Sequence, residues 1–292
     1  MLDAGIRPLT EPEFRRFREL VEEQVGIHLS SVKQALVNAR LLARIRELGL
    51  RTFGEYYDCV IKSPHDELIR FINAICTNET RFFREPNQFD YLRRKLIPYW
   101  LAESAAGRHA RRVRMWSAAC SSGEEPYSVA MTLLHELPPE WAVEVVASDI
   151  STKVLERALG AIYPLERVNE IPNELQKPFL LRGTGSRAGS FRIGPNARAV
   201  VRFQRENLVT SDFAPLGSFD LIMCRNVLMY FKEETRREVV AKLVRRLVPN
   251  GHLFVGHSES LHGFGLGLET MAPAMYQRRD QREASSSERG AA

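Results

Sequence analysis

Acidic side chains stand where two predicted strands end. In the stretch WSAACSSGEEPYS, small residues lead from a strand into Glu124 and Glu125, and Asp149 closes the next strand. Phosphate binding is disfavoured because neither GxGxxG nor GxxxxGK[ST] occurs. Two glutamates at a helix start favour a cationic ligand, although such carboxylates also simply complement the helix dipole. An acidic residue after a second strand is typical of ribose binding. The pattern favours a cation that carries a ribose, and S-adenosylmethionine is such a compound.

Two later segments add polar residues at further strand ends. RENLVT contains Asn207, and CRNVLMY contains Arg225 and Asn226. In a doubly wound sheet, ligands bind outside the carboxyl ends of the strands, where the strand order reverses. We therefore expect these loops, which are distant in sequence, to meet the two acidic segments at one edge of the sheet.

The order of elements that must position these loops predicts an α/β fold. From Arg112 onward, apolar strands alternate with helical segments, which indicates a doubly wound, Rossmann-like sheet with helices on both faces. One such helix is expected to run through KEETRREVVAKLVRRL and end at 249–251. Short β-prone pieces separated by Gly, Asn and Pro predict a small antiparallel insertion at 177–206. We assign this domain to 76–280 and expect a disordered polar tail at 281–292.

A small all-α domain is predicted ahead of it, over residues 8–75. Thr10 and Glu13 have the spacing of a capping box, and Gly26 provides a helix stop. The apolar residues of this first helix recur at helical spacing; they are Phe14, Phe17, Val21 and Val25.

The second predicted helix has a basic face. Its apolar stripe is expected to contain Leu36, Leu41, Ile45 and Leu48, and its positive face Lys33, Arg40, Arg44 and Arg51. Charged helix faces are often only solvated surface. Because the sequence places few carboxylates on this face, we interpret it as a docking site for an acidic helix. Nucleic acid is disfavoured as the partner because exposed aromatic residues and zinc-finger or RNA-binding signatures are lacking.

Composition limits the class of protein. The chain has 292 residues, 44% hydrophobic and 26% charged, with a net charge of +5, which is typical of soluble globular proteins with an acidic partner. The start of the chain resembles no export signal, so we expect a cytoplasmic protein. The four cysteines are irregularly spaced and predict neither a zinc site nor disulfides. We expect no metal at His252, His257, Glu259 and His262 either.

Five segments, taken in order, resemble the bacterial chemotaxis receptor methyltransferases, the CheR family. They are TNETRFFRE, WSAACSSGEEPYSVAM, ASDIS, FDLIMCRNVLMYF and GHLFVGHSESL. The resemblance covers roughly residues 10–278 and implies a protein-glutamate O-methyltransferase that uses S-adenosylmethionine and releases S-adenosylhomocysteine. The implied substrate is a set of glutamate side chains on the cytoplasmic helices of chemoreceptors.

The resemblance also implies roles for individual residues. Cofactor contacts are implied for Asn78, Thr80, Arg84, one of Glu124 and Glu125, Asp149, Asn207, Leu208, Arg225 and Asn226. Arg84 and Tyr230 match residues beside the transferred methyl group. Receptor docking is expected from Lys33, Arg40, Arg44 and Arg46, although Ala43 stands where the family carries a further arginine. We expect a monomer that inserts into no membrane. The alternatives are a signalling module that only binds the cofactor or its product, and a methyltransferase for nucleic acid or a small molecule.

Overall fold

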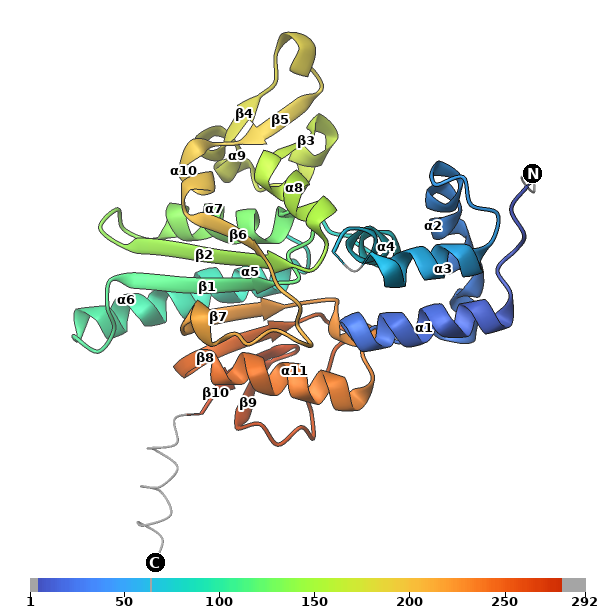
Figure 1. The fold of residues 1–292 in the computed structure, drawn as a ribbon. Helices are drawn as coiled ribbons and strands as arrows, with labels where there is room; N and C mark the ends of the chain where they lie inside the picture. The colour runs from blue at the N-terminus through green and yellow to red at the C-terminus, as the bar shows by residue number, and fades with distance from the viewer. Residues whose placement is uncertain (1–4, 64, 280–292) are drawn as a thin grey trace, which may run out of the picture.

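The computed structural model describes residues 5–63 and 65–279, so the predicted tail 281–292 lies outside the described residues. A helical unit at the N-terminus packs beside the carboxyl ends of the strands of a larger α/β unit (Figure 1). The predicted fold class is therefore confirmed: a small all-α part precedes a Rossmann-like α/β domain that carries a small antiparallel sheet.

The helical unit has its own apolar core. Its helices are α1 (Glu11–Val25), α2 (Gln34–Glu47), α3 (Phe53–Lys62) and α4 (Glu67–Ile75). The predicted capping box of α1 is present, since the Thr10 hydroxyl and backbone N–H both donate to the Glu13 carboxylate. Gly26 ends this helix in the left-handed conformation, with φ 71°. The predicted apolar face of α1 is buried in this core.

The apolar stripe of α2 differs from the expectation. Leu41 and Ile45 are buried as predicted, but Leu36 and Leu48 are 39% and 38% exposed. Val37 is buried in their place. Positions 37, 41 and 45 follow the i, i+4, i+8 spacing of one helix face, so the stripe is narrower and turned by one residue.

A long helical segment precedes the first strand of the α/β unit. It consists of α5 (Pro86–Tyr91), a π-helical turn at Leu92–Leu96 and α6 (Ile97–Ala105). Pro86 lies at the start of this segment, where its missing N–H costs no helical hydrogen bond. The segment packs on the same face of the sheet as α7 (Glu124–Glu136).

The central sheet has seven strands in the order β6-β2-β1-β7-β8-β10-β9. They are β1 (Arg112–Ala118), β2 (Ala142–Asp149), β6 (Val201–Arg205), β7 (Phe219–Cys224), β8 (Leu247–Val255), β9 (Leu268–Ala272) and β10 (Met275–Arg278). The first five are parallel in pairing, and β10 runs antiparallel to both its neighbours. The order reverses between β1 and β7, so a ligand site is expected at the carboxyl ends of these strands.

Helices cover both faces of the sheet, as its buried strands require. Adjacent residues of β7 pack into different cores: Leu221 with α7, and Ile222 with α11 (Glu233–Arg245). The remaining helices are α8 (Thr152–Gly160), α9 (Asn173–Phe179) and α10 (Pro195–Ala199), with 3-10 turns at Ser31–Lys33, Leu165–Glu170, Gly185–Arg187, Ala214–Leu216 and Leu228–Tyr230. The prediction that the helix of α11 continues to 249–251 was wrong, because β8 begins at Leu247 and pairs with β7.

The antiparallel insertion begins earlier than the range 177–206 suggested. Its sheet has the order β3-β5-β4 and comprises β3 (Ile162–Pro164), β4 (Leu180–Arg182) and β5 (Ser190–Ile193). The stretch Val201–Arg205 is instead β6, which pairs in parallel with β2 in the central sheet. Sequence alone could not separate these short strands by the sheet that they join.

Candidate functional site

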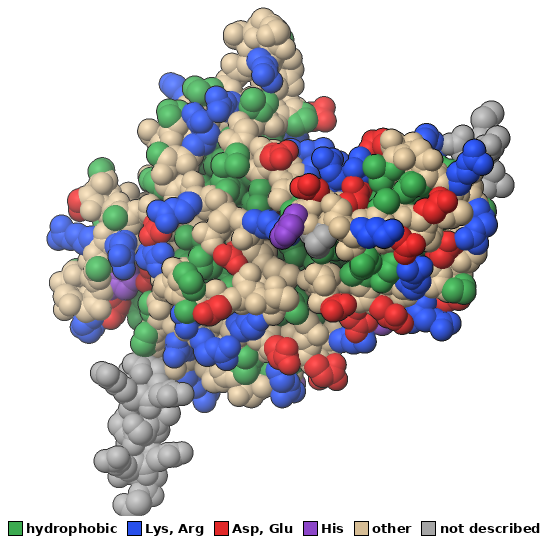
Figure 2. Space-filling model, viewed as in Figure 1, with side chains coloured by type: hydrophobic (Ala, Val, Ile, Leu, Met, Phe, Trp, Pro, Cys, Tyr) green, Lys and Arg blue, Asp and Glu red, His purple; other side chains and the backbone are tan. Residues whose placement is uncertain are grey.

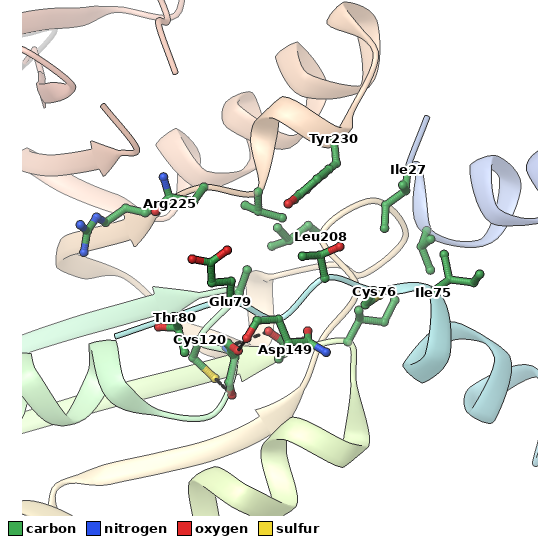
Figure 3. Close-up of a pocket in the computed structure, with 18 of the residues that line it drawn as sticks. Ile27, Ile75, Cys76, Glu79, Thr80, Cys120, Asp149, Leu208, Arg225 and Tyr230 are labelled. Carbon is green, nitrogen blue, oxygen red and sulfur yellow. Dashed lines mark hydrogen bonds between the residues drawn. The ribbon is translucent and has the colours of Figure 1, made fainter. Parts of the chain in front are cut away.

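A pocket lies between the helical unit and the carboxyl ends of the central strands (Figure 3). Loops that follow β1, β2, β6 and β7 meet the connecting segment 77–84 and one side of α2 there. All but one of the predicted cofactor and methyl-transfer residues line it: Asn78, Thr80, Arg84, Glu125, Asp149, Asn207, Leu208, Arg225, Asn226 and Tyr230.

The two glutamates of the GEE motif point to different surroundings. Glu125 lines the pocket, where its carboxylate accepts from the Ser117 hydroxyl at 2.7 Å. Glu124 does not line it. Its side chain is 1% exposed and forms an ion pair with Arg167. The sequence left open which of Glu124 and Glu125 belongs to the site, and in the structure Glu125 is the one that lines the pocket.

Asp149 is held by the backbone around it. One carboxylate oxygen accepts from Ser121 N–H and the other from Ser151 N–H, each at 2.9 Å. Burial raises the pKa of Asp149, and these backbone donors oppose the increase. A carboxylate oxygen has two acceptor positions. Because Ile150 N–H is a third backbone donor to this carboxylate, one of its four acceptor positions remains for a ligand hydroxyl.

Arg225 lies directly after β7, at the carboxyl ends of the central strands, which we call the strand-end rim. Its side chain is 2% exposed and lies 3.0 Å from both the Glu85 and the Glu125 carboxylates. It also donates to the carbonyl of Arg84. Burial raises the pKa of Glu125, whereas for Glu85 the opposing effects of Arg225 and neighbouring donors outweigh burial and lower the pKa. One guanidinium thus links the loop after β7 to the start of α7 and to the connecting segment.

Five residues in the segments that meet at this arginine adopt backbone conformations that are rare for side-chain-bearing residues. Phe83, Glu85, Ala119, Ser121 and Asn226 all have φ between 49° and 71°. Such conformations cost free energy and cluster at sites where surrounding contacts enforce them. Their concentration around this pocket is typical of a functional site.

Glu259 enforces one of these conformations, and sequence reasoning considered it only as a metal ligand. It is 3% exposed. Its carboxylate accepts from the backbone N–H groups of Asn226, Met229 and Gly256 at 2.9, 3.2 and 2.7 Å. The glutamate therefore fixes the loop that presents Asn226 and Tyr230. No cluster of three or more metal-binding side chains forms within residues 5–63 and 65–279.

The helical unit closes one side of the pocket through backbone contacts. His28 N–H donates to the Tyr230 carbonyl at 2.7 Å, and Ile27 pairs with Phe231 as an isolated bridge. The Asn207 amide donates to the Gln24 carbonyl at 2.8 Å. The positions of Tyr230 and Asn207 consequently depend on how the end of α1 and the residues directly after it pack against the α/β unit.

The basic residues on the face of α2 have different surroundings along the helix. Lys33 and Arg40 line the pocket. The Lys33 ammonium lies 5.4 Å from the centroid of the Tyr230 ring, and Arg40 donates to Thr77 at 2.9 Å. Arg44 instead pairs with Glu67 at 2.6 Å and Glu47 at 2.9 Å, so the expectation that few carboxylates neutralise this face was wrong at that position. Arg46 and Arg51 are exposed.

The pocket combines opposite charges. The strand-end side contributes Glu125, Asp149 and Glu206 together with Arg225, which is paired with Glu125, whereas α2 and the turn before it contribute Lys33 and Arg40. The connecting segment adds Glu79, Arg81 and Arg84. Two carboxylates of this lining, Glu79 and Glu206, were missed although they lie in TNETRFFRE and RENLVT, because other residues of those segments were selected. Figure 2 shows that basic and acidic side chains alternate over much of this face of the molecule. Net charge therefore identifies the pocket less well than the local arrangement does.

Comparison with known proteins matches both parts of the chain. A family profile described as CheR methyltransferase, all-alpha domain, matches residues 12–76, and one described as CheR methyltransferase, SAM binding domain, matches residues 78–274. In the described part of the chain, every helix is too short or too polar to cross a membrane.

Relatives named as chemotaxis protein methyltransferases are similar in sequence to this chain over most of its length. The chain is 42% identical to chemotaxis protein methyltransferase 2 of Pseudomonas aeruginosa over 86% of this chain and 87% of that protein. The corresponding protein of Escherichia coli is 40% identical over 86% and 85%, and that of Borreliella burgdorferi is 36% identical over 92% and 95%. The chain therefore belongs to the CheR family of chemotaxis methyltransferases, whose methyl donor is S-adenosylmethionine.

Proposed function

We propose that the protein transfers methyl groups from S-adenosylmethionine to glutamate side-chain carboxylates on the cytoplasmic helices of chemoreceptors, for chemotaxis adaptation. The observation that carries the proposal is the division of charge within one pocket. Carboxylates from the strand ends, where Arg225 is itself paired with two carboxylates, face the same space as the cations Lys33 and Arg40 of the helical unit. The first set suits a cofactor with a positive sulfur, and the second suits an anionic acceptor.

The donor chemistry of the pocket fits this cofactor. The Asp149 carboxylate keeps an acceptor position beside its backbone donors, and a ribose hydroxyl can donate to it. Glu125 and Asn78 would contact the polar part of the cofactor, and the buried Leu208 offers an apolar contact for the adenine. When bound, the cofactor supplies a methyl group on a positively charged sulfur.

The remaining side chains would orient the acceptor. A glutamate carboxylate has a pKa of about 4.3, so it is already an anion at neutral pH and needs no general base. Alignment of the attacking oxygen with the methyl group is then the main source of rate enhancement. We assign the orientation of the acceptor to Arg84 and the fixing of the methyl region to Tyr230. Both line the pocket, and Tyr230 is held through its carbonyl by His28.

We also propose that residues 8–75 dock the receptor and that 76–280 carry out the methyl transfer. Lys33, Arg40 and Arg46 are the docking residues in this proposal, because Arg44 is occupied by two carboxylates. An acidic receptor helix that binds along α2 would bring its glutamates to the mouth of the pocket, since Lys33 and Arg40 belong to both surfaces.

A transfer assay tests this function. The protein is incubated with radiolabelled methyl donor and either receptor cytoplasmic fragments or RNA, and the label is then exposed to mild base. Base-labile methyl ester on the receptor fragment is the expected result, with loss of turnover in an Arg84→Ala variant. Label on RNA, or cofactor binding without transfer to any receptor fragment, would contradict the proposal.

A further inference from the structure

We propose that Arg167 is a positioning residue through which the antiparallel insertion holds the cofactor pocket in shape. The inference rests on the proposed cofactor site, and it concerns a residue that does not line that site. Arg167 lies on the 3-10 turn Leu165–Glu170, directly after the first strand of the insertion.

The Arg167 guanidinium binds two segments of the pocket wall at once. It donates to the Thr80 carbonyl at 2.9 Å and forms an ion pair with Glu124. Thr80 belongs to the connecting segment, whereas Glu124 is the first residue of α7, next to Glu125. The side chain therefore ties together two walls that are 44 positions apart in sequence, and it does so from behind the pocket.

Glu170 extends the same contact. It receives two hydrogen bonds from Arg167, from Nε at 3.1 Å and from Nη2 at 3.0 Å. Its second oxygen also accepts from Phe82 N–H at 2.8 Å. The guanidinium carbon lies 5.6 Å from the centroid of the Phe82 ring, within the range of a cation–π contact. The turn thus forms hydrogen bonds to the connecting segment at residues 80 and 82, between Asn78 and Arg84.

A second contact from the insertion supports the loop after β1. The Tyr163 hydroxyl donates to the Ser122 carbonyl at 2.7 Å. Gly123 follows, with φ +96°, and an added Cβ there would lie 3.0 Å from the Tyr163 hydroxyl and 2.9 Å from the Ala158 Cβ. The loop is therefore packed closely against the insertion, and Arg167 is part of an extended support.

Burial makes the arginine difficult to replace. Glu124 is 1% exposed on its side chain, so loss of Arg167 would leave a carboxylate buried without its cation. That carboxylate can regain solvent only if the start of α7 moves, and Glu125 would move with it. We therefore expect weaker cofactor binding, without a change in the chemistry of the bound complex.

Calorimetry with S-adenosylhomocysteine tests the inference on the full-length protein. We expect Arg167→Met to raise the Kd about tenfold or more. Arg167→Lys should give an intermediate value, because an ammonium cannot donate to all three acceptors in the fixed planar arrangement of a guanidinium. Arg187→Met removes an exposed arginine of the same insertion and should leave the Kd unchanged.

Kinetics distinguish positioning from a general loss of structure. In Arg167→Met, the KM for the methyl donor should rise, whereas kcat at saturating donor should stay within about twofold of the parent enzyme and the KM for receptor fragments should not change. The double variant Arg167→Met, Glu124→Gln removes the buried charge together with its partner. It should therefore recover part of the lost affinity, and it remains informative if the single variant fails to fold.

Opposite results separate this inference from the proposed site. Unchanged affinity in Arg167→Met, an equal loss in Arg187→Met, or a fall in kcat at unchanged donor KM would overturn the role of Arg167. Asp149→Asn serves as the reference for the site itself. If that variant binds S-adenosylhomocysteine as the parent does, the proposed cofactor site is wrong, whatever Arg167→Met does.

Discussion

The strand-end rim and the basic face of α2 both carry charged side chains, but they hold them in different ways. At the rim, Arg225 is 2% exposed and contacts two carboxylates. On α2, Arg46 is exposed, and Arg40 reaches the connecting segment through Thr77. Buried charges require partners in fixed geometry, whereas exposed charges interact weakly and are screened by salt. Changes at the rim should therefore affect folding and cofactor binding, and changes on α2 should affect encounter with the substrate.

Arg44 shows that position on a helix does not decide which of these two classes a residue belongs to. It shares the basic face of α2, yet its ion pair with Glu67 resembles the contacts of the rim, since the Glu67 side chain is only 9% exposed. Four variants can test this comparison.

The largest effect is expected from Arg225→Met. Removal of this cation leaves the Glu85 and Glu125 carboxylates buried without the guanidinium that they share, with only neutral donors such as the Ser117 hydroxyl and His257 N–H hydrogen-bonded to them. We expect the free energy of unfolding to fall by about 3–5 kcal/mol, measured by chemical denaturation. Combining the change with Glu85→Gln and Glu125→Gln should restore part of the loss. A stability close to that of the parent in the single variant would mean that the rim is not held by charge.

Asp149→Asn should weaken cofactor binding more than it affects folding. The amide group offers fewer acceptor positions for ribose hydroxyls, which should cost about 1.5–3 kcal/mol, or about tenfold or more in Kd. Calorimetry with S-adenosylhomocysteine measures this loss.

The pH dependence of the same site has a defined sign. Because burial raises the pKa of Asp149, this carboxyl group takes up a proton at a higher pH than an ordinary aspartate. Protonation removes an acceptor, so cofactor affinity should fall as the pH is lowered. The affinity of Asp149→Asn should depend less on pH. An equally steep dependence in the variant would assign the titration to another group.

Arg44→Met should act as a change in the fold. Loss of the charged hydrogen bonds to Glu67 is expected to cost about 2 kcal/mol of unfolding free energy, while the KM for receptor fragments at low salt stays unchanged. If the KM for receptor fragments rises while the stability stays that of the parent, Arg44 is a docking residue instead.

Lys33→Met should give the smallest effect and the opposite pattern. Its ammonium lies over the Tyr230 ring at the pocket and, among residues 5–63 and 65–279, forms no ion pair with a carboxylate. We expect unchanged thermal stability and a loss of about 0.5–1 kcal/mol in receptor binding. The difference from the parent should disappear at high salt, which steady-state kinetics at two ionic strengths would measure.

Much of the fold followed from local patterns. The capping box at Thr10, the stop at Gly26 and the alternation of strands and helices depend on neighbouring residues, and the structure agrees with them. The end of α11 and the extent of the insertion were wrong for one shared reason. Residues 247–250 and Val201–Arg205 are strands only because distant strands pair with them, and pairing between distant segments leaves no local signal.

The site divides in the same way. Residue types and their places after strands were sufficient to select Asp149, Arg225 and Asn226 as pocket residues, because parallel strands bring their carboxyl ends to one edge. Glu259 and Arg167 were not selected as supports of that pocket. Both act through backbone groups of remote loops, and any residue type can present a backbone N–H or carbonyl.

The sequence by itself determined the α/β class, the family and ten of the residues that line the pocket, because these depend on periodicity, on motifs and on side-chain chemistry. Only the tertiary structure decided that Glu125 enters the pocket while Glu124 pairs with Arg167, and that Arg44 is neutralised while Lys33 faces Tyr230. Adjacent residues on a helix point in directions about 100° apart, and what each direction meets is set by segments far away in the chain.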